Sequence, residues 1–164
     1  MEFLADSGID IDLAVLTDRE MQTSVADIYA AGDMVQFHDA VIGKDVVSAL
    51  WGNAVHMGRT AGFTMSGIKA LVPPLLSSLN STEIAGLPII SAGLLHTDSS
   101  HYAVYTEAQG ENYRKLIFDQ DRLVGMIFLG DVSRAGVYTN LIRNRIPLGE
   151  RKDALVHEIM AEIF

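Results

Sequence analysis

The sequence predicts an α+β protein: short strands and one long helix, then a small domain with an antiparallel sheet of four to five strands and C-terminal helices. Three observations predict this class. Residues 45–67 have helical spacing, two adjacent prolines follow at Pro73 and Pro74, and β-rich runs separated by short turn signals come after them. Short turns connect antiparallel strands, so the second half is a meander rather than a series of βαβ units.

The N-terminal elements are expected to be short. Residues 2–8 predict one helical turn, and residues 9–18 predict a strand in which acids and aliphatic residues alternate. Ile28 and Tyr29 lie on a further short strand, and residues 34–45 are expected to form a loop.

The long helix is predicted from its apolar stripe and contains three internal glycines. The stripe repeats at intervals of three and four residues, and it consists of Leu50, Ala54, Met57, Ala61 and Met65. Each internal glycine costs about 1 kcal/mol relative to alanine. Glycines at such positions let a neighbouring backbone or a ligand approach closely, and here they are Gly52, Gly58 and Gly62.

The second half supplies strands first and helices afterwards. Strands are predicted at residues 86–95, 101–108, 112–119 and 122–131, with turn signals "QGEN" and "DQDR" between the last three. Asp131 or Ser133 is expected to cap a helix over residues 132–145 that Pro147 ends, and residues 150–164 predict a last amphipathic helix. The predicted domains are residues 1–72 and 83–164, joined by a linker at 73–82.

Composition excludes several classes of function. The chain of 164 residues has a net charge of −9 and no cluster of basic residues, which argues against a surface for nucleic acid or anionic membrane. It has no cysteine, so any redox chemistry depends on a bound cofactor. No apolar run approaches the ~20 residues of a membrane span, and a cytoplasmic location is expected.

The stretch Ala30–Asp33 has the residue types that a bulky polar ligand requires. Two alanines and a glycine allow backbone groups to come close to a ligand, and the Asp33 carboxylate can accept hydrogen bonds from vicinal hydroxyls. A helix that begins near Asp45 would present its first amides to a partial negative charge. On their own, these residues predict a polyol- or nucleotide-like ligand. The same residue types also occur in many ordinary turns.

The longer context resembles a known cofactor motif. "TSVADIYAAGD" followed by "SALWGNAVHMGRTAGFTMSG" is similar to the second FAD-binding motif of the pyridine nucleotide-disulfide oxidoreductase superfamily. The resemblance implies that Asp33 hydrogen-bonds the flavin ribitol and that Gly32 provides close backbone approach. It also implies that the helix start faces the pyrimidine edge of the flavin, which by position assigns the amides of Val46 and Val47 to that edge.

The second half narrows the resemblance. Residues 111–148 are similar to the small α+β domain of NADH:rubredoxin reductase-like enzymes and of NADH-dependent nitrite reductase large subunits. The glutathione reductase type of interface domain carries a His-Pro-Thr motif with a following glutamate. The nearest string here, "HTDSSH" at residues 96–101, lacks the proline and the glutamate, so dithiol exchange is disfavoured.

The resemblance implies a C-terminal portion of an FAD-dependent NAD(P)H oxidoreductase, which passes electrons from NAD(P)H through flavin to a protein or small-molecule acceptor. The glycine-rich motif GxGxxG, which holds dinucleotide phosphates, is absent from these residues. We therefore expect a remnant of an FAD-binding domain that is inactive alone, with no catalytic side chain of its own. The alternative is a stand-alone dimerisation or protein-interaction module, and a homodimer is compatible with either.

Other histidine, aspartate and tryptophan side chains offer further candidates for chemistry. His96, Asp98 and His101 have no metal-ligand spacing and are expected to lie in a polar loop. His38 and Asp39 are expected to be a surface loop pair. Trp51 is compatible with stacking on an aromatic ligand, and a core or interface anchor is favoured.

Overall fold

The computed structural model describes residues 2–39 and 41–157. It consists of two compact units, Met1–Ser77 and Ser78–Phe164, which we call unit 1 and unit 2 and describe separately. Within the described residues no helix is both long enough and apolar enough to span a membrane.

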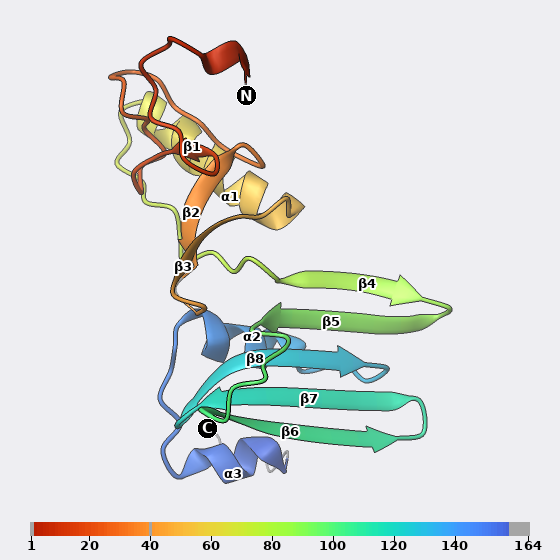
Figure 1. Cartoon of the computed structure of the whole chain (residues 1–164). Coiled ribbons are helices and arrows are strands. Elements are labelled where there is room, and N and C mark those ends of the chain that lie inside the picture. The colour runs from red at the N-terminus through yellow and green to blue at the C-terminus, as the bar shows by residue number, and fades with distance from the viewer. Residues whose placement is uncertain (1, 40, 158–164) are drawn as a thin grey trace. The chain divides into compact units, whose positions relative to one another are not determined.

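Unit 1 contains a small sheet and one long helix (Figure 1). A 3-10 turn, η1 (Glu2–Leu4), precedes the strands β1 (Val15–Leu16), β2 (Val35–Asp39) and β3 (Lys44–Val47). The sheet order is β1-β2-β3, with β1 parallel and β3 antiparallel to the central strand. Helix α1 (Trp51–Met65) follows.

The core of unit 1 lies between the sheet, α1 and the segment that leaves the helix. It is small and consists of Met21, Val35, Met57, Ala61, Val72 and Leu75. The predicted apolar stripe of the helix is confirmed at its centre, where Met57 and Ala61 are buried. It is wrong at Met65, which is exposed.

Three predictions for unit 1 need correction. Residues 34–45, expected to be a loop, are mostly β2 and β3, since the β-branched pair Val46–Val47 pairs with β2 instead of starting a helix. Helix α1 consequently begins at Trp51 and not near Asp45. The strand expected at residues 9–18 shrinks to β1.

Part of the segment 73–82 makes specific contacts with unit 1. The Ser77 amide donates to Asp39 Oδ2 (2.7 Å), and the Ser48 hydroxyl donates to the Ser77 carbonyl (2.9 Å). The Asn53 side-chain amide donates to the Leu76 carbonyl (3.1 Å). The segment up to Ser77 therefore belongs to unit 1. A strand of unit 2 already begins at Asn80.

Unit 2 is an antiparallel five-stranded sheet with helices, as the sequence predicts (Figure 1). Its order is β4-β5-β8-β7-β6. The strands are β4 (Asn80–Ile84), β5 (Leu87–Gly93), β6 (Tyr102–Gln109), β7 (Asn112–Asp119) and β8 (Arg122–Leu129). The hairpin turns fall at the predicted turn signals, so β6, β7 and β8 form a meander.

Two helices complete unit 2. Helix α2 (Ala135–Arg143) packs on β8 and β5, and α3 (Arg151–Val156) follows it. The buried Tyr138 of α2 makes an edge-to-face contact with Phe128 (4.8 Å between centroids), and its hydroxyl donates to the Leu155 carbonyl. The last helix was predicted over residues 150–164, and residues 158–164 of this range lie outside the described residues.

The predicted cap of α2 is not a helix cap. The Asp131 carboxylate accepts a hydrogen bond from the Ser133 amide (3.0 Å), which forms a turn before the helix, and Arg134 occupies the N-cap position. These hydrogen bonds from Ser133, first that of its backbone amide and then that of its side chain, lower the pKa of Asp131 below its ordinary value.

Candidate functional site

The turn at Gly32 and Asp33 leaves a carboxylate at the surface. Gly32 has a φ of +87°, which the absence of a Cβ permits, and its carbonyl accepts from the Val35 amide (3.0 Å). Asp33 is exposed, and no described residue hydrogen-bonds its side chain. The turn therefore presents an ionisable group whose acceptor oxygens are not used within the described part of unit 1.

This turn packs against the beginning of α1. The Gly32 amide points at Met57 Sδ (3.4 Å), and a Cβ built on Gly32 would lie 3.7 Å from Ala54 Cβ. Ala54 and Met57 belong to the first two turns of the helix. Asp33 and the N-terminus of α1 thus occupy one corner of unit 1.

The N-terminus of α1 carries unused amide donors. The first bond of the helix runs from the Ala54 amide to the Leu50 carbonyl (3.0 Å), and Leu50 makes no side-chain cap. The amides of Trp51, Gly52 and Asn53 therefore have no intrahelical partner, and the helix dipole adds partial positive charge there. This end of the helix suits an acceptor with partial negative charge.

The structure separates Val46 and Val47 from that helix end. Both lie on β3, where Val46 is opposite Phe37 and Val47 opposite Gln36. Their assignment to the helix start was wrong, although their contact with a cofactor stays a prediction. The sequence reasoning missed Trp51–Asn53 as the helix-end amides, and the β-branched pair was the signal that would have moved the helix start.

Asp39 was also misplaced by the sequence reasoning, because it is fully buried. Its Oδ1 accepts from the amides of Val41 (2.8 Å) and Ile42 (3.2 Å), while Oδ2 accepts from Ser77. Its neighbour His38 is exposed and pairs with Asp45 (2.8 Å). Asp39 is therefore a structural anchor in the part of the chain that the structure describes, and its oxygens are occupied.

The histidines of unit 2 do not form a metal centre. His96 pairs with Asp98 (3.2 Å), and His101 pairs with Asp119 (2.9 Å). Among residues 2–39 and 41–157, no three His, Cys, Asp or Glu side chains are grouped as a metal site requires.

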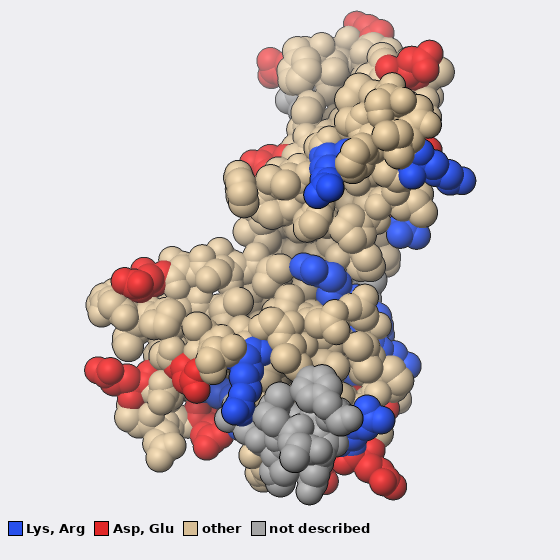
Figure 2. Space-filling model, turned by 180° about the vertical axis from the view of Figure 1, so that it is seen from behind, with Lys and Arg blue, Asp and Glu red and all other residues tan. Residues whose placement is uncertain are grey.

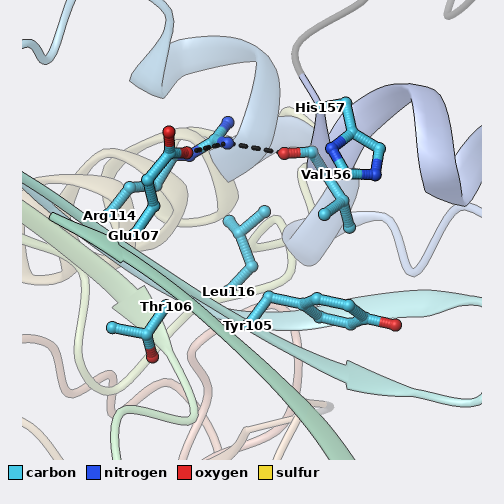
Figure 3. A pocket seen from close by; sticks show the side chains of 7 residues that line it. All are labelled: Tyr105, Thr106, Glu107, Arg114, Leu116, Val156 and His157. Carbon is cyan, nitrogen blue, oxygen red and sulfur yellow. Dashed lines mark hydrogen bonds and ion pairs between the residues drawn. The ribbon is translucent and has the colours of Figure 1, made fainter. Parts of the chain in front are cut away.

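A pocket of about 300 Å³ lies in unit 2 between β6, β7 and the end of α3 (Figure 3). Its arginine, Arg114, donates to Glu107 Oε2 (2.8 Å) and to the Val156 carbonyl (2.5 Å). Figure 3 shows both interactions of Arg114 among the residues that line the pocket. The guanidinium group of Arg114 connects the sheet to α3, so its hydrogen bonds have a structural role. We therefore do not take this pocket as the candidate site.

Charge does not define a binding face on the surface that Figure 2 shows. Acidic and basic side chains are interspersed there among uncharged ones, without a continuous basic patch. This agrees with the net charge of −9.

Comparison with known proteins identifies the second half of the chain. Residues 79–146 match the model of the rubredoxin NAD+ reductase C-terminal domain. The matched residues make up most of unit 2. They cover β4 to β8 and α2, so the resemblance inferred from residues 111–148 is confirmed.

Two curated relatives extend the similarity over unit 1. The chain is 25% identical, over 167 residues, to the assimilatory nitrate reductase electron transfer subunit of Bacillus subtilis, covering 100% of this chain and 21% of that protein. It is 27% identical, over 133 residues, to the NADH-rubredoxin oxidoreductase of Clostridium acetobutylicum, covering 81% of this chain and 33% of that protein. The chain thus spans a third or less of the length of these relatives.

Solved structures share the fold. NADH:rubredoxin oxidoreductase from Clostridium acetobutylicum superposes with a TM-score of 0.73 at 25% identity, over 96% of this chain and 40% of that one. An FAD-dependent pyridine nucleotide-disulphide oxidoreductase from Desulfovibrio vulgaris gives a TM-score of 0.79 at 20% identity, over 97% and 43%. Both the unit with the Gly32–Asp33 turn and unit 2 therefore have structural counterparts in these two proteins.

Proposed function

We propose that this chain supplies the ribitol and pyrimidine edge of the FAD site of an NAD(P)H-dependent oxidoreductase. The observation that carries the proposal is the corner of unit 1 where the exposed Asp33 carboxylate, which no described residue hydrogen-bonds, adjoins the uncapped start of α1. An acceptor for hydroxyl groups beside donors for a partial negative charge fits the two polar parts of a flavin.

Asp33 has the role of a ribitol anchor in this proposal. Its carboxylate accepts hydrogen bonds from the ribitol hydroxyls, and a charged acceptor makes such bonds stronger than a neutral one. Gly32 has no side chain to obstruct the approach, and its left-handed backbone turns the chain so that Asp33 faces outward.

The first backbone amides of α1 have a second role in this proposal, which is to bind the pyrimidine edge of the flavin. Trp51, Gly52 and Asn53 are proposed to donate to the electron-rich pyrimidine edge and to stabilise the negative charge that accumulates there on reduction. Bound flavin would supply the hydride and electron chemistry, while these residues bind and orient it. No side chain of the chain is assigned a catalytic role.

The names of two relatives support a proposal for the reaction partners. Their names describe NADH-rubredoxin oxidoreductase and an electron transfer subunit. We extend this to the present chain as a proposal: electrons pass from NAD(P)H through flavin to a protein or small-molecule acceptor, and further polypeptide completes the cofactor site.

The test is a titration of the isotope-labelled chain with FMN, which contains the ring and ribitol but no adenosine. Amide NMR signals of Gly32, Asp33 and the first turn of α1 are expected to shift, even if binding is weak. Asp33→Ala is expected to weaken binding about tenfold or more, because a hydrogen bond to a charged group contributes about 1.5–3 kcal/mol. Asp10→Ala, at an exposed aspartate elsewhere in unit 1, is the matched control.

Signals that stay unchanged at this corner up to millimolar FMN would contradict the proposed function. An Asp33→Ala variant that binds FMN as tightly as the parent would contradict the role of Asp33 alone.

A further inference from the structure

Trp51 is the one tryptophan of the chain, and it is 84% exposed at the first residue of α1. A core anchor is therefore excluded in the described structure. No described residue makes an aromatic contact with its indole. Exposing so large an apolar ring is costly, so such a residue in unit 1 calls for an external partner.

The surroundings of Trp51 continue the apolar surface. Val55 follows one helical turn later on the same face of α1, and it is also exposed (44%). At the next position, Gly52, a Cβ would meet nothing within 4 Å. A flat apolar group therefore has both a surface to contact and room beside the helix start.

The same turn of helix borders the proposed cofactor edge. Ala54, three residues after Trp51, is the residue that the Gly32 turn approaches. The indole thus emerges from the helical turn whose amides are proposed to meet the pyrimidine edge. A ring held at its edge by those amides would extend over the neighbouring side chains.

We infer that the Trp51 indole stacks on the flavin ring system and holds it against the start of α1. The inference rests on the proposed function and makes Trp51 a cofactor-positioning residue. Stacking of an aromatic side chain on a heteroaromatic ring contributes enough binding energy to matter in a shallow, one-sided site.

Because Trp51 is the one tryptophan, its fluorescence reports on this contact directly. Titration with FMN is expected to quench it, while ADP, which lacks the flavin ring, leaves it unchanged. N-acetyltryptophanamide titrated in parallel corrects for light that FMN absorbs. The indole N–H signal in the NMR spectrum is expected to shift with the same dissociation constant as the amides of Gly32 and Asp33.

Variants test the energetic contribution. Trp51→Ala is expected to weaken FMN binding about fivefold or more, and Trp51→Phe, which keeps an aromatic ring, to recover part of the loss. Phe63→Ala alters another exposed aromatic residue on α1, three turns away, and is expected to leave binding unchanged. Chemical denaturation of each variant separates loss of binding from loss of folding.

The outcomes separate the two proposals. Shifted Gly32 and Asp33 amides with an unquenched Trp51 would overturn the stacking and leave the proposed function intact. No response of either would overturn both. A Trp51 signal that changes with protein concentration in the absence of FMN, and a self-association that Trp51→Ala removes, would instead show that the indole anchors a second copy of the chain.

Discussion

Two aspartates six residues apart, Asp33 and Asp39, have opposite environments in unit 1. Asp33 is exposed and makes no hydrogen bond to the described residues, whereas Asp39 is fully buried and accepts three from backbone amides. A buried carboxylate is retained only when its oxygens are satisfied, while an exposed one is free to meet a ligand. The difference in burial separates a folding role from a binding role.

Replacing Asp39 with alanine is expected to lower the free energy of unfolding by more than about 2 kcal/mol, because three amides lose their acceptor inside the protein. Urea denaturation measures the change. Asp33→Ala is the control, and it is expected to stay within about 0.5 kcal/mol of the parent. Equal effects of the two substitutions would contradict the assignment of Asp39 as an anchor.

The hydrogen bonds of Asp131 lead to a prediction, also at the scale of a single residue, about how stability depends on pH. Since hydrogen bonds from Ser133 lower its pKa in the folded chain, the stabilisation from this turn is complete above the ordinary value of 3.8. It is lost as pH falls through the lowered pKa. An NMR titration of the carboxyl carbon is expected to give a pKa below 3.8, and Ser133→Ala to raise it part of the way. A titration at or above 3.8 in the parent chain would contradict this.

At the scale of elements, helix α1 starts later than its sequence pattern predicts. Its internal glycines also lack the close neighbours that the pattern led us to expect. Apart from the chain neighbours and the backbone of α1 itself, no described residue comes within 4 Å of a Cβ built on Gly52, Gly58 or Gly62. These glycines therefore do not serve close packing against other parts of unit 1. Their helical backbone would accept a side chain without obstruction.

Gly58→Ala and Gly62→Ala are accordingly expected to stabilise the chain by about 0.5–1 kcal/mol each, since alanine loses less backbone entropy in a helix. Thermal or urea denaturation tests this. Gly32→Ala is the contrasting variant: its φ of +87° forces alanine into the left-handed region, and we expect a loss of about 1–2 kcal/mol. Destabilisation by the helical substitutions would mean that something outside the described contacts needs those glycines.

The elements also show what sequence reasoning can reach. Strands β5 to β8 of unit 2 were predictable because β-rich runs alternate with turn signals, and β6, β7 and β8 pair through short hairpins. Strand β4 was missed because its first residues resemble a linker. The β2–β3 hairpin was missed because it is brief and Asp39 looks like a surface residue. The burial of Asp39 depends on its hydrogen bond with Ser77, which lies 38 residues further along the chain. A local sequence pattern cannot predict such a distant contact.

At the scale of the whole molecule, the chain comprises two units with separate cores. The core cluster of unit 1 contains few side chains, while several large ones are fully buried in unit 2, among them Tyr138, Phe118 and Met126. Exposed apolar residues such as Trp51 further limit the apolar burial of unit 1. Burial of apolar surface is the main stabilising term, so the units are expected to differ in stability.

Native-state hydrogen exchange tests this difference. The amide of Val35 in unit 1 is expected to exchange through a lower-energy opening than that of Leu116 in unit 2, with separate denaturant dependence. Asp39→Ala should accelerate exchange at Val35 and leave Leu116 unchanged. One common opening energy for both amides would show that the chain unfolds as a single cooperative unit.

The glycine at the centre of β8 has a consequence for mutational tolerance. A Cβ on Gly125 would overlap the Leu94 carbonyl oxygen, and one on Gly93 would overlap the Val124 carbonyl oxygen, because the chain leaving β5 passes directly over the sheet. Gly125 lies in a strand and does not have a positive φ, so size alone restricts it. In a saturation library selected for folded protein, position 125 should retain glycine and reject even alanine, while Gly110, with open space around it, should be limited only by its turn.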